Sequence, residues 1–465
     1  MAVEAALNAA PKDAANPGIP FGLRLSFGIG SLSQATVLNS TSVLLLFYMT
    51  NLLGIRPSVG GALLFISKLV DVLSNPLIGI ISDRTHTRIG RRRPYLLGGG
   101  LLMAATFVAV FNVPAFDSEM VVAGYLLVMM ILLSLAYAAF TVPYLAVAAE
   151  TTRTYDERTS IMAYRVVFIL VGSLVGTAVA PAIATPEGVG TRETFAQMSL
   201  LLGVIITVAA LWCFWGTRRA RFFAPDGESP GLLQQLRVAA ANGPFVTLAT
   251  AKLLQLIGVA SVITCALYLT RYVLDITGIK VALFFLTMSV SSTIAVPLWW
   301  WLARRLGKKA AYMAAVVTYA LTALTWFAAT PVVVDADMLP VYARAVLLGI
   351  SSGGLILLGV SMLPDTIEYD HVQSGKRREG IFTGIWSAVE KGAVAVGGLI
   401  VGLLLDGMGF IESTGELVTQ PESAITGIII GAALLPALFM LSSLPLLLRY
   451  PLTQQRMAEI EGTPG

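Results

Sequence analysis

Lys68 and Asp71 lie three residues apart within a long apolar segment, so one helical turn would bring their side chains together. A charge in the middle of a membrane costs a few kcal/mol and is therefore a functional hypothesis by default. A partly desolvated carboxyl group at Asp71 could carry a proton, and Lys68 could neutralise it within the helix. A purely structural ion pair is the alternative, although buried pairs stabilise little by themselves. We predict a cation-coupling site that includes Asp71 and Lys68.

Arg165 and Lys391 are two further cations inside apolar segments. The fork of an arginine can hold vicinal hydroxyl groups or a carboxylate through paired hydrogen bonds. Lys391 could balance Asp71 or Glu390 in one conformational state and a bound solute in another. A structural charge network is the alternative, because charges inside a membrane usually pair with one another.

The elements that position these charges must be membrane-spanning helices. Of the 465 residues, 56% are hydrophobic and 12% are charged, against roughly a quarter charged in an ordinary soluble domain. The apolar residues come in runs of about twenty, long enough to cross roughly 30 Å of hydrocarbon as a helix. A helix satisfies its own backbone hydrogen bonds, which lipid cannot do. We therefore predict an all-α membrane protein rather than a soluble enzyme.

Apolar runs between charged, proline or glycine breaks predict twelve spans in two sets of six. The first set covers residues 25–49, 58–82, 94–114, 119–148, 158–183 and 195–216, and the second covers 244–273, 278–303, 309–330, 339–363, 379–406 and 423–449. The predicted domains are a tail over 1–20, a six-helix bundle over 21–216, a linker over 217–243, a second six-helix bundle over 244–450 and a tail over 451–465. The first tail lacks a basic region followed by an apolar one, so no cleaved signal peptide is expected.

Basic residues gather in alternate loops. The loops on the side of the N-terminus hold most of the lysines and arginines, among them Arg91, Arg92, Arg93, Arg304, Arg305, Lys308 and Lys309. This bias predicts that both termini are cytoplasmic and that the chain is a multi-pass protein of the inner (plasma) membrane. The excess of basic over acidic residues thus reflects the orientation of the chain in the bilayer, and no nucleic-acid partner is expected.

The two sets of spans echo each other, which is the signature of an internal repeat. Asn75-Pro76-Leu77 in the second span is matched by Val296-Pro297-Leu298 in the eighth. Two six-helix halves in parallel orientation resemble the major facilitator fold. That resemblance implies a solute cavity between the halves, near the middle of the membrane.

The segment from Gly79 to Arg93 resembles the cytoplasmic signature loop of the major facilitator superfamily. It begins Gly79-x-x-x-Asp83-Arg84 and continues as Gly90-Arg91-Arg92-Arg93. Gly79 would let helices approach closely, and Asp83 with the arginines would bond neighbouring helix ends. The predicted cytoplasmic gate comprises Gly79, Asp83, Arg84, Arg91 and Arg92, with orientation charge alone as the alternative.

Three motifs narrow the resemblance. They are Arg24-Leu25-Ser26-Phe27-Gly28-Ile29-Gly30, Asp71-Val72-Leu73-Ser74-Asn75-Pro76-Leu77-Ile78-Gly79 and Ser361-Met362-Leu363-Pro364-Asp365-Thr366. Together they resemble the glycoside–pentoside–hexuronide:cation symporters, the family of the melibiose permease and the plant sucrose carriers. The resemblance extends over nearly the whole chain. It implies cation-coupled symport of a sugar, glycoside, hexuronide or related polar organic solute by alternating access.

The chain departs from this family at the cation site. Asp71 lies where the family places a carboxylate, but Asn75 stands one turn later, where a second acid is usual. Sodium needs oxygen ligands and charge balance, so we expect a proton rather than sodium as the coupling ion, and no cofactor. The predicted coupling residues are Lys68, Asp71, Asn75 and Lys391. An uncoupled facilitator is the first alternative.

The solute site departs from the melibiose permease pattern as well. Ala35 and Thr141 stand where that pattern has substrate-binding acids. Because the acids are lost and the cations are kept, an anionic solute such as a hexuronide is favoured. The predicted solute-binding residues are Gln34, Asn39, Tyr137, Thr141, Tyr144, Tyr164, Arg165, Trp386 and Lys391. For the polar and aromatic members of this set, packing between helices is the alternative.

Other kinds of chemistry find little support in the sequence. His86 and His371 lie in predicted loops far from any cluster of acids or cysteines, so no metal site is expected. Lys252 is expected to extend to the membrane interface. No phosphate-binding or catalytic motif is present. We expect a monomer in the lipid bilayer that binds a small solute and a cation. A carrier of lysolipids or other amphiphiles is the second alternative, which an apolar lateral cleft would favour.

Overall fold

The computed structural model describes residues 20–151, 155–219, 232–376 and 378–453, together with residues 456, 457 and 459. Most of the two predicted tails, and residues 220–231 of the predicted linker, lie outside this part of the chain. The described residues form helices and loops without strands, and twelve helices are long and apolar enough to cross a membrane. The predicted all-α membrane fold is confirmed.

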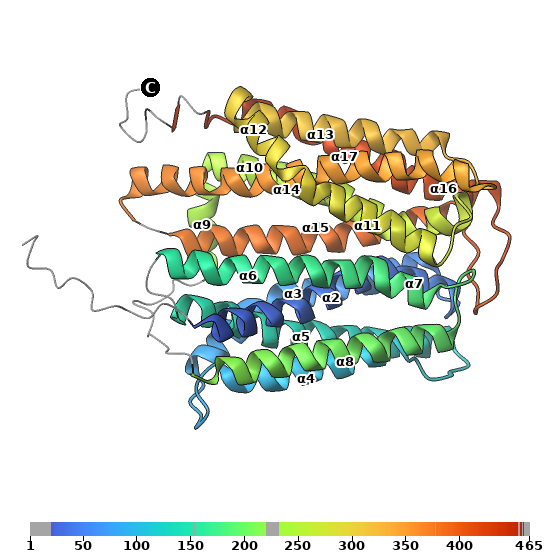
Figure 1. Ribbon diagram of the computed structural model, residues 1–465, viewed down its shortest axis with the longest axis horizontal. Coiled ribbons are helices and arrows are strands. Elements are labelled where there is room, and N and C mark those ends of the chain that lie inside the picture. The colour runs from blue at the N-terminus through green and yellow to red at the C-terminus, as the bar shows by residue number, and fades with distance from the viewer. Residues whose placement is uncertain are drawn as a thin grey trace, which may run out of the picture.

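The spans form two groups of six, which lie one above the other in Figure 1. The first group contains α2 (Phe21–Asn51), α3 (Pro57–Arg84), α4 (Arg93–Phe111), α5 (Glu119–Thr151), α6 (Tyr155–Leu174) continued by η1 (Val175–Val179) and α7 (Ala180–Ala184), and α8 (Arg192–Gly216), which η2 (Thr217–Arg219) extends. We call this group the N half.

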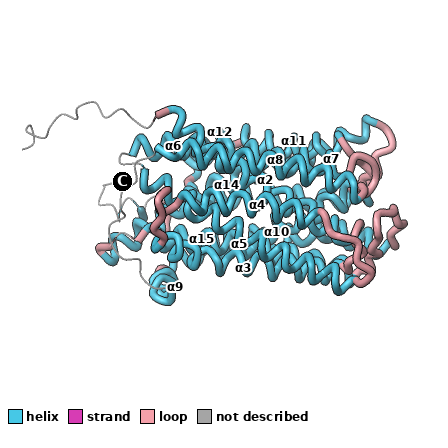
Figure 2. The backbone as a smooth tube through the Cα atoms, turned by 90° about the horizontal axis from the view of Figure 1, so that it is seen from below, coloured by secondary structure: helices cyan, strands magenta, loops and turns pink. Residues whose placement is uncertain are grey.

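The second group, the C half, follows a short helix, α9 (Leu232–Ala241), within the predicted linker. It contains α10 (Gly243–Tyr268) with η3 (Leu269–Val273), α11 (Ile279–Ile294) with α12 (Val296–Leu306), α13 (Lys308–Leu324) with η4 (Thr325–Ala328), η5 (Asp335–Asp337) leading into α14 (Met338–Ser374), α15 (Glu379–Gly407), and α16 (Glu422–Ile429) with η6 (Ile430–Leu434) and α17 (Leu435–Arg449). All spans run along one direction, with loops at the two ends (Figure 2).

One span is longer than the sequence indicates. The tenth span was expected to end near Pro364, yet α14 continues through this proline to Ser374. Neighbouring helices can accommodate the backbone group that a proline leaves unbonded, so a proline need not end a membrane helix. The helix ends instead at Gly375, whose φ of 66° and N–H bond to the carbonyl of His371 form a left-handed cap.

The two halves are joined by hydrogen bonds at one end of the bundle. This end lies opposite the end that carries the α3–α4 and α14–α15 loops, which we call the basic end. Thr50 and Tyr268 share a hydrogen bond of 2.6 Å between their hydroxyl groups, and Tyr272 donates to Asn51. In the α15–α16 loop, Ser413 donates from its hydroxyl to the carbonyl of Asn51 at 2.7 Å. These bonds tie the C-terminus of α2 to the C half and close that end.

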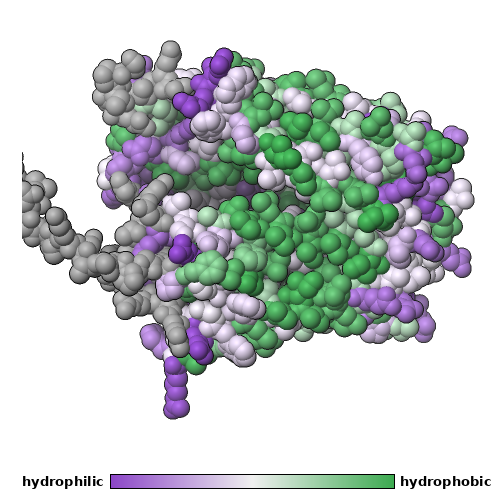
Figure 3. All heavy atoms as spheres, in the orientation of Figure 1, coloured by the Kyte–Doolittle hydropathy of each residue, from purple (hydrophilic) through white to green (hydrophobic). Residues whose placement is uncertain are grey.

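Toward the basic end the halves separate. Figure 3 shows the surface hollowed between the two halves on that side of the molecule. The molecule is therefore closed at the opposite end and open toward the basic end.

Helices α3 and α15 cross closely where the halves meet. A Cβ atom on Gly402 would lie 2.9 Å from the Cα of Gly61 and would also collide with the carbonyl oxygen of Pro57. A Cβ atom on Gly61 would lie 3.2 Å from the Cα of Gly402. Small residues at both positions therefore let the two backbones touch, which is the usual way for membrane helices to associate.

We expect Gly402→Ala to lower the free energy of unfolding by about 1–3 kcal/mol, because the added methyl group overpacks this crossing. The melting temperature of the purified protein measures the effect. Gly384→Ala on the same helix is the control, since an added Cβ there meets nothing within 4 Å. A Gly402→Ala protein that melts together with the wild type would contradict the close crossing.

Candidate functional site

An ion pair links the two halves in the middle of the membrane. The ammonium group of Lys391 on α15 donates to Oδ1 of Asp71 on α3 at 2.8 Å, and only 4% of the Asp71 side chain is exposed. The same ammonium lies 5.5 Å from the ring centroid of Tyr137 on α5. Because the surroundings exclude water, this charge-assisted bond is stronger than an exposed pair would be.

Lys68 does not take the role that its spacing predicted. The sequence indicated that Lys68 could neutralise Asp71 within one helix, but Asp71 pairs with Lys391 across the interface instead. In the described part of the chain, Lys68 forms no ion pair or hydrogen bond. Its ammonium is near enough to both partners to be attracted by Asp71 and repelled by Lys391.

Lys68 and Asp71 line a cleft of about 780 Å³, counting the space at its open mouth. The cleft lies between α2, α3 and α5 of the N half and α10 and α15 of the C half. Its polar lining comprises Thr41, Ser42, Ser67, Lys68, Asp71, Ser134, Tyr137 and Thr264, and its apolar lining includes Val37, Leu38, Leu45, Leu64, Met130, Leu133, Ala260, Ile263 and Val394. The cleft thus combines two charged side chains with a largely aliphatic lining.

Four of the predicted site residues in the N half carry polar atoms that are buried without a hydrogen-bond partner among the described residues. These atoms are Nε2 of Gln34, Oδ1 of Asn75, Oγ1 of Thr141 and Nε of Arg165. Buried polar atoms are almost always satisfied in folded proteins, so exceptions need a cause. Such atoms are available to bond water or a solute.

Arg165 is an intramembrane cation without a carboxylate partner among the described residues. Its guanidinium acts electrostatically on Tyr137, which lines the cleft, and on Tyr144. Its backbone carbonyl accepts a hydrogen bond of 2.9 Å from Ser31, which joins α6 to α2. A forked cation held in this way is suited to bind an anionic group.

Of the nine predicted solute-binding residues, Tyr137 lines the cleft, whereas the other eight, among them Gln34, Thr141, Arg165 and Lys391, do not. Four of these eight contact protein groups elsewhere. Asn39 donates from its side chain to the carbonyl of Ala35 in its own helix. Tyr144 is fully buried, donates to the carbonyl of Phe27 and stacks on the Phe27 ring. Tyr164 packs against Phe21 and Arg24 where α2 begins. Trp386 is 5% exposed and faces the interior of the C half. In this conformation these four residues make packing contacts within the protein, which was the alternative to solute binding.

A second charged cluster lies inside the C half. Lys252 on α10 is 3% exposed, so the expectation that it extends to the membrane interface was wrong. Its ammonium donates to the carbonyl of Leu355 on α14 at 3.3 Å and lies 5.9 Å from the ring centroid of Trp386. Glu390 accepts a hydrogen bond of 3.0 Å from the Trp386 indole, and it acts electrostatically on Lys252.

The sequence analysis missed this cluster because Lys252 lies near a predicted span end and Glu390 is far away along the chain. Consecutive residues of α15 thus serve different interfaces. Lys391 contacts the N half, whereas Glu390 contacts the indole inside its own half. The C-half cluster holds the face of α15 that presents Lys391 to Asp71.

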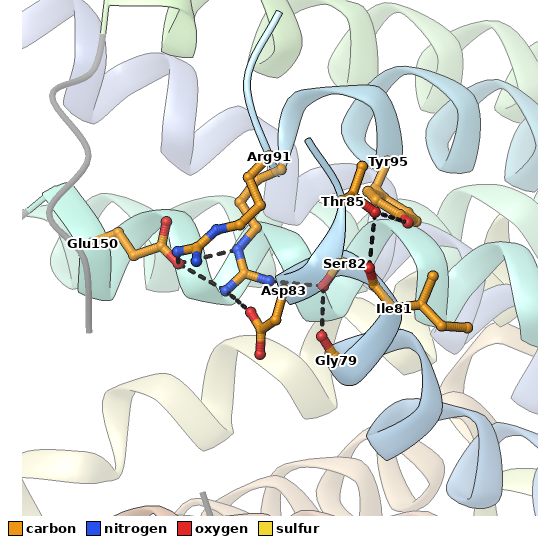
Figure 4. A network of polar contacts seen from close by, with 9 residues as sticks. Gly79, Ile81, Ser82, Asp83, Thr85, Arg91, Tyr95 and Glu150 are labelled. Atoms are coloured by element: carbon orange, nitrogen blue, oxygen red, sulfur yellow. Dashed lines mark hydrogen bonds and ion pairs between the residues drawn. The ribbon is translucent and has the colours of Figure 1, made fainter. Parts of the chain in front are cut away.

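Three of the five predicted gate residues, Asp83, Arg91 and Arg92, form a network at the basic end of the N half (Figure 4). Arg92 binds Asp83 at 2.5 Å and Glu150 at 2.7 Å, and it donates to the Ser82 hydroxyl at 2.7 Å. Arg91 also reaches Glu150 at 2.7 Å. Glu150, at the end of α5, was not predicted, although its place beside a basic loop was a usable signal. The network ties α3, α4 and α5 together within one half.

Two other predicted gate residues, Gly79 and Arg84, contribute no side chain to this network. A Cβ atom on Gly79 would lie 3.8 Å from Val142, which is an ordinary contact, so the helices do not need a glycine there. Gly79 instead accepts a hydrogen bond from Ser82 through its carbonyl. Arg84 is exposed and has no ion pair in the described part of the chain. The C half repeats the arrangement in a simpler form, since Lys308 binds Asp365 at 2.7 Å.

No group of three or more histidine, cysteine or acidic side chains that could hold a metal ion occurs among the described residues.

Comparison with known proteins identifies the same architecture. The family model described as MFS/sugar transport protein matches residues 26–454. A putative glycoside/cation symporter of Escherichia coli is 26% identical, with 94% of this chain and 93% of the relative covered. The glucuronide carrier protein homolog of the same bacterium is 27% identical, with the same coverage. The mouse sodium-dependent lysophosphatidylcholine symporter 1 is 25% identical over 93% of this chain and 86% of its own.

Solved structures agree on the fold. The crystal structure of a bacterial homolog of the human lysosomal transporter Spinster superposes with a TM-score of 0.65 at 13% identity, covering 93% of this chain and 98% of that one. This similarity concerns the path of the backbone and carries no information on the solute.

We expect Lys252→Met to destabilise the protein by about 1–3 kcal/mol, because the half-buried Glu390 carboxylate then lacks its nearby counter-charge. The double variant Lys252→Met with Glu390→Gln should recover most of that loss, since neither charge remains. Melting temperatures of the two variants and of Glu390→Gln provide the comparison. If the loss of stability in the double variant equals the sum of the losses in the two single variants, the two side chains are independent.

Proposed function

We propose that this chain, which belongs to the MFS/sugar transport protein family, is a proton-coupled secondary transporter of an anionic sugar derivative such as a hexuronide or glucuronide. The observation that carries the proposal is the ion pair between Asp71 and Lys391, which joins the two halves beside the cleft. The chain is a transporter rather than an enzyme. Alternating access would expose the cleft to one side of the membrane at a time.

The ion pair offers a direct route from ion binding to conformation. When Asp71 accepts a proton it becomes neutral, and its attraction for Lys391 falls from that of an ion pair to that of a hydrogen bond. The two halves then lose a connection in the middle of the membrane, and Lys391 becomes free to bind a solute. Coupling requires that ion and solute shift the same conformational equilibrium, and here both act on one lysine.

A proton fits the coupling site better than sodium. Asp71 is the carboxylate at the cleft, and its oxygen is already bound to an ammonium group. Lys68 adds a second positive charge nearby. A hard cation would have to bind against two ammonium groups with one carboxylate and the Asn75 carbonyl oxygen as side-chain ligands, which is poor charge balance for sodium.

The charge around the cleft favours an anionic solute. Lys68, Arg165 and Lys391 contribute three positive charges, and Asp71 contributes one negative charge. Excess positive charge at membrane depth is costly unless a ligand balances it. A carboxylate on the solute would supply that balance through the Arg165 fork, while its hydroxyl groups would bond Gln34 and Thr141. One relative is named as a glucuronide carrier homolog, which agrees with this class.

The aliphatic side of the cleft favours a second candidate. Leu38, Leu64 and Leu133 are part of the aliphatic lining of the cleft, and such a lining would accept an acyl chain. A lysolipid or similar amphiphile with an anionic phosphate would then use the same cations. The relative named as a lysophosphatidylcholine symporter supports including this class in any screen.

The orientation and state of the protein are part of the proposal. The basic end would face the cytoplasm of the inner membrane, because its loops carry Arg84, Arg88, Arg91 and Lys308. The structure would then represent the state that is open to the cytoplasm. We propose a monomer as the working unit, since each chain holds both halves of the cleft.

We expect Asp71→Asn to abolish uphill accumulation while leaving solute exchange at a measurable fraction of the wild-type rate, because the amide cannot cycle a proton. Proteoliposomes supplied with radiolabelled methyl glucuronide and an imposed pH gradient measure accumulation. The wild type should concentrate the probe, lose this ability with an uncoupler, and ignore a sodium gradient.

Glu119→Gln, which changes an exposed acid at the opposite end, is the matched control and should accumulate normally. Uphill uptake retained by Asp71→Asn would refute the coupling role. Accumulation driven by sodium alone would refute the choice of ion.

We expect Arg165→Gln to raise the KM for methyl glucuronide by about 10- to 100-fold, the equivalent of a lost charge-assisted hydrogen bond of roughly 1.5–3 kcal/mol. The KM for neutral methyl glucoside should change less than about 2-fold. Arg165→Lys should fall between the wild type and Arg165→Gln, because lysine keeps the charge but lacks the fork. Equal changes for both probes would remove Arg165 from carboxylate recognition.

A further inference from the structure

The outer surface of α12 carries two adjacent pairs of arginine and tryptophan. The Arg304 guanidinium carbon lies 4.9 Å from the ring centroid of Trp300, and that of Arg305 lies 4.9 Å from the ring centroid of Trp301. Trp300 is 55% exposed and Trp301 is 47% exposed. Each indole therefore supports a guanidinium on one face and leaves half of its surface uncovered.

These two arginines differ from the other cations at the same corner of the molecule. Lys308 binds Asp365, and Lys309 donates to the carbonyls of Leu448 and Tyr450. Arg304 and Arg305, by contrast, have neither a carboxylate nor a hydrogen-bond acceptor among the described residues. Their guanidinium N–H groups are held in place by the indole rings beneath them but donate to no acceptor in this part of the structure.

An exposed apolar stripe leads away from Trp301 toward the middle of the membrane. Val290, Ile294 and Leu298 are 46%, 71% and 51% exposed, and their spacing of four residues keeps them on one helix face. The backbone stays helical across the junction of α11 and α12, since the Trp299 N–H bonds the Ala295 carbonyl. From Val290 to Trp301 the helix rises about 16 Å, close to the roughly 15 Å of hydrocarbon in one leaflet.

We propose that this surface, formed by Val290, Ile294, Leu298, Trp300, Trp301, Arg304 and Arg305, is a binding site for an anionic phospholipid of the leaflet at the basic end. The two guanidinium groups bind the phosphate oxygens, which match their fork geometry. The indoles lie at the level of the glycerol backbone, where tryptophan is favoured. One acyl chain follows the aliphatic stripe.

The charge of the site selects the headgroup. Two adjacent guanidinium groups attract a lipid whose headgroup carries net negative charge. They repel the ammonium of a zwitterionic lipid, because no acid lies beside them to receive it. None of these residues lines the cleft, so the lipid site is independent of the proposed solute and coupling ion.

Native mass spectrometry of the full-length protein, titrated with phosphatidylglycerol or phosphatidylcholine, tests the proposal. We expect the wild type to bind phosphatidylglycerol at least 10-fold more tightly than phosphatidylcholine. Arg304→Gln with Arg305→Gln should erase this preference. Trp300→Leu with Trp301→Leu should reduce it while keeping both charges, because the guanidinium groups lose their supports.

The control variant, Arg237→Gln with Arg449→Gln, removes the same charge from exposed arginines at the same end of the molecule and should keep the preference. Melting temperatures within about 2 °C of the wild type verify folding. Equal loss of preference in the control, or no loss in Arg304→Gln with Arg305→Gln, would overturn the site. Displacement of the lipid by millimolar glycerol phosphate would also overturn it, because the acyl chain would then contribute nothing.

Discussion

The architecture depends on one constraint: charges in the middle of a membrane must be balanced, and here the balance crosses the boundary between the halves. Asp71 belongs to α3 and Lys391 belongs to α15. Had Asp71 been neutralised by Lys68 within its own helix, a change of its charge would leave the interface untouched. Because the partner lies on the other half, every change in the charge of Asp71 also changes the attraction between the two bundles. In the proposed mechanism, an ion and a rigid-body motion are thereby connected through a single bond.

The polar groups in the central parts of the two halves differ in how far they are satisfied, although buried atoms without partners also occur elsewhere in the C half, such as Nε1 of Trp326. In the C half, Lys252, Trp386 and Glu390 satisfy one another or bond a backbone carbonyl. In the N half, Gln34, Thr141 and Arg165 keep buried polar atoms without partners. A satisfied cluster favours a rigid body, whereas unsatisfied groups favour binding of something that completes them. In the proposed mechanism, the C half supports α15 and the N half offers the groups that recognise the solute.

The connections between the halves are unequal along the membrane normal. At the opposite end, Thr50 bonds Tyr268, Asn51 bonds Tyr272 and Ser413, and the glycines of α3 and α15 touch. At the basic end, the strong contacts stay within a half, as Arg92 with Glu150 and Lys308 with Asp365 show. Bonds within a half hold each bundle rigid during rocking, and bonds between the halves must break for the opposite end to open. A two-state carrier requires this division between lasting bonds within each half and breakable bonds between the halves.

The sequence alone determined the helical membrane fold, the twelve spans and which charged residues lie inside apolar segments. These follow from composition and from local spacing, which a helix of fixed pitch converts into structure. The network around Arg92 was also predictable in part, because its loop carries a recognisable motif. Its partner Glu150 was not predicted. Only the tertiary structure decided which charges meet. It paired Asp71 with a residue 320 positions away, enclosed Lys252 beside Glu390, and turned Trp386 away from the cleft. The physical reason is that partner choice depends on which helix faces come together, and the pitch of a single helix holds no information about its neighbours.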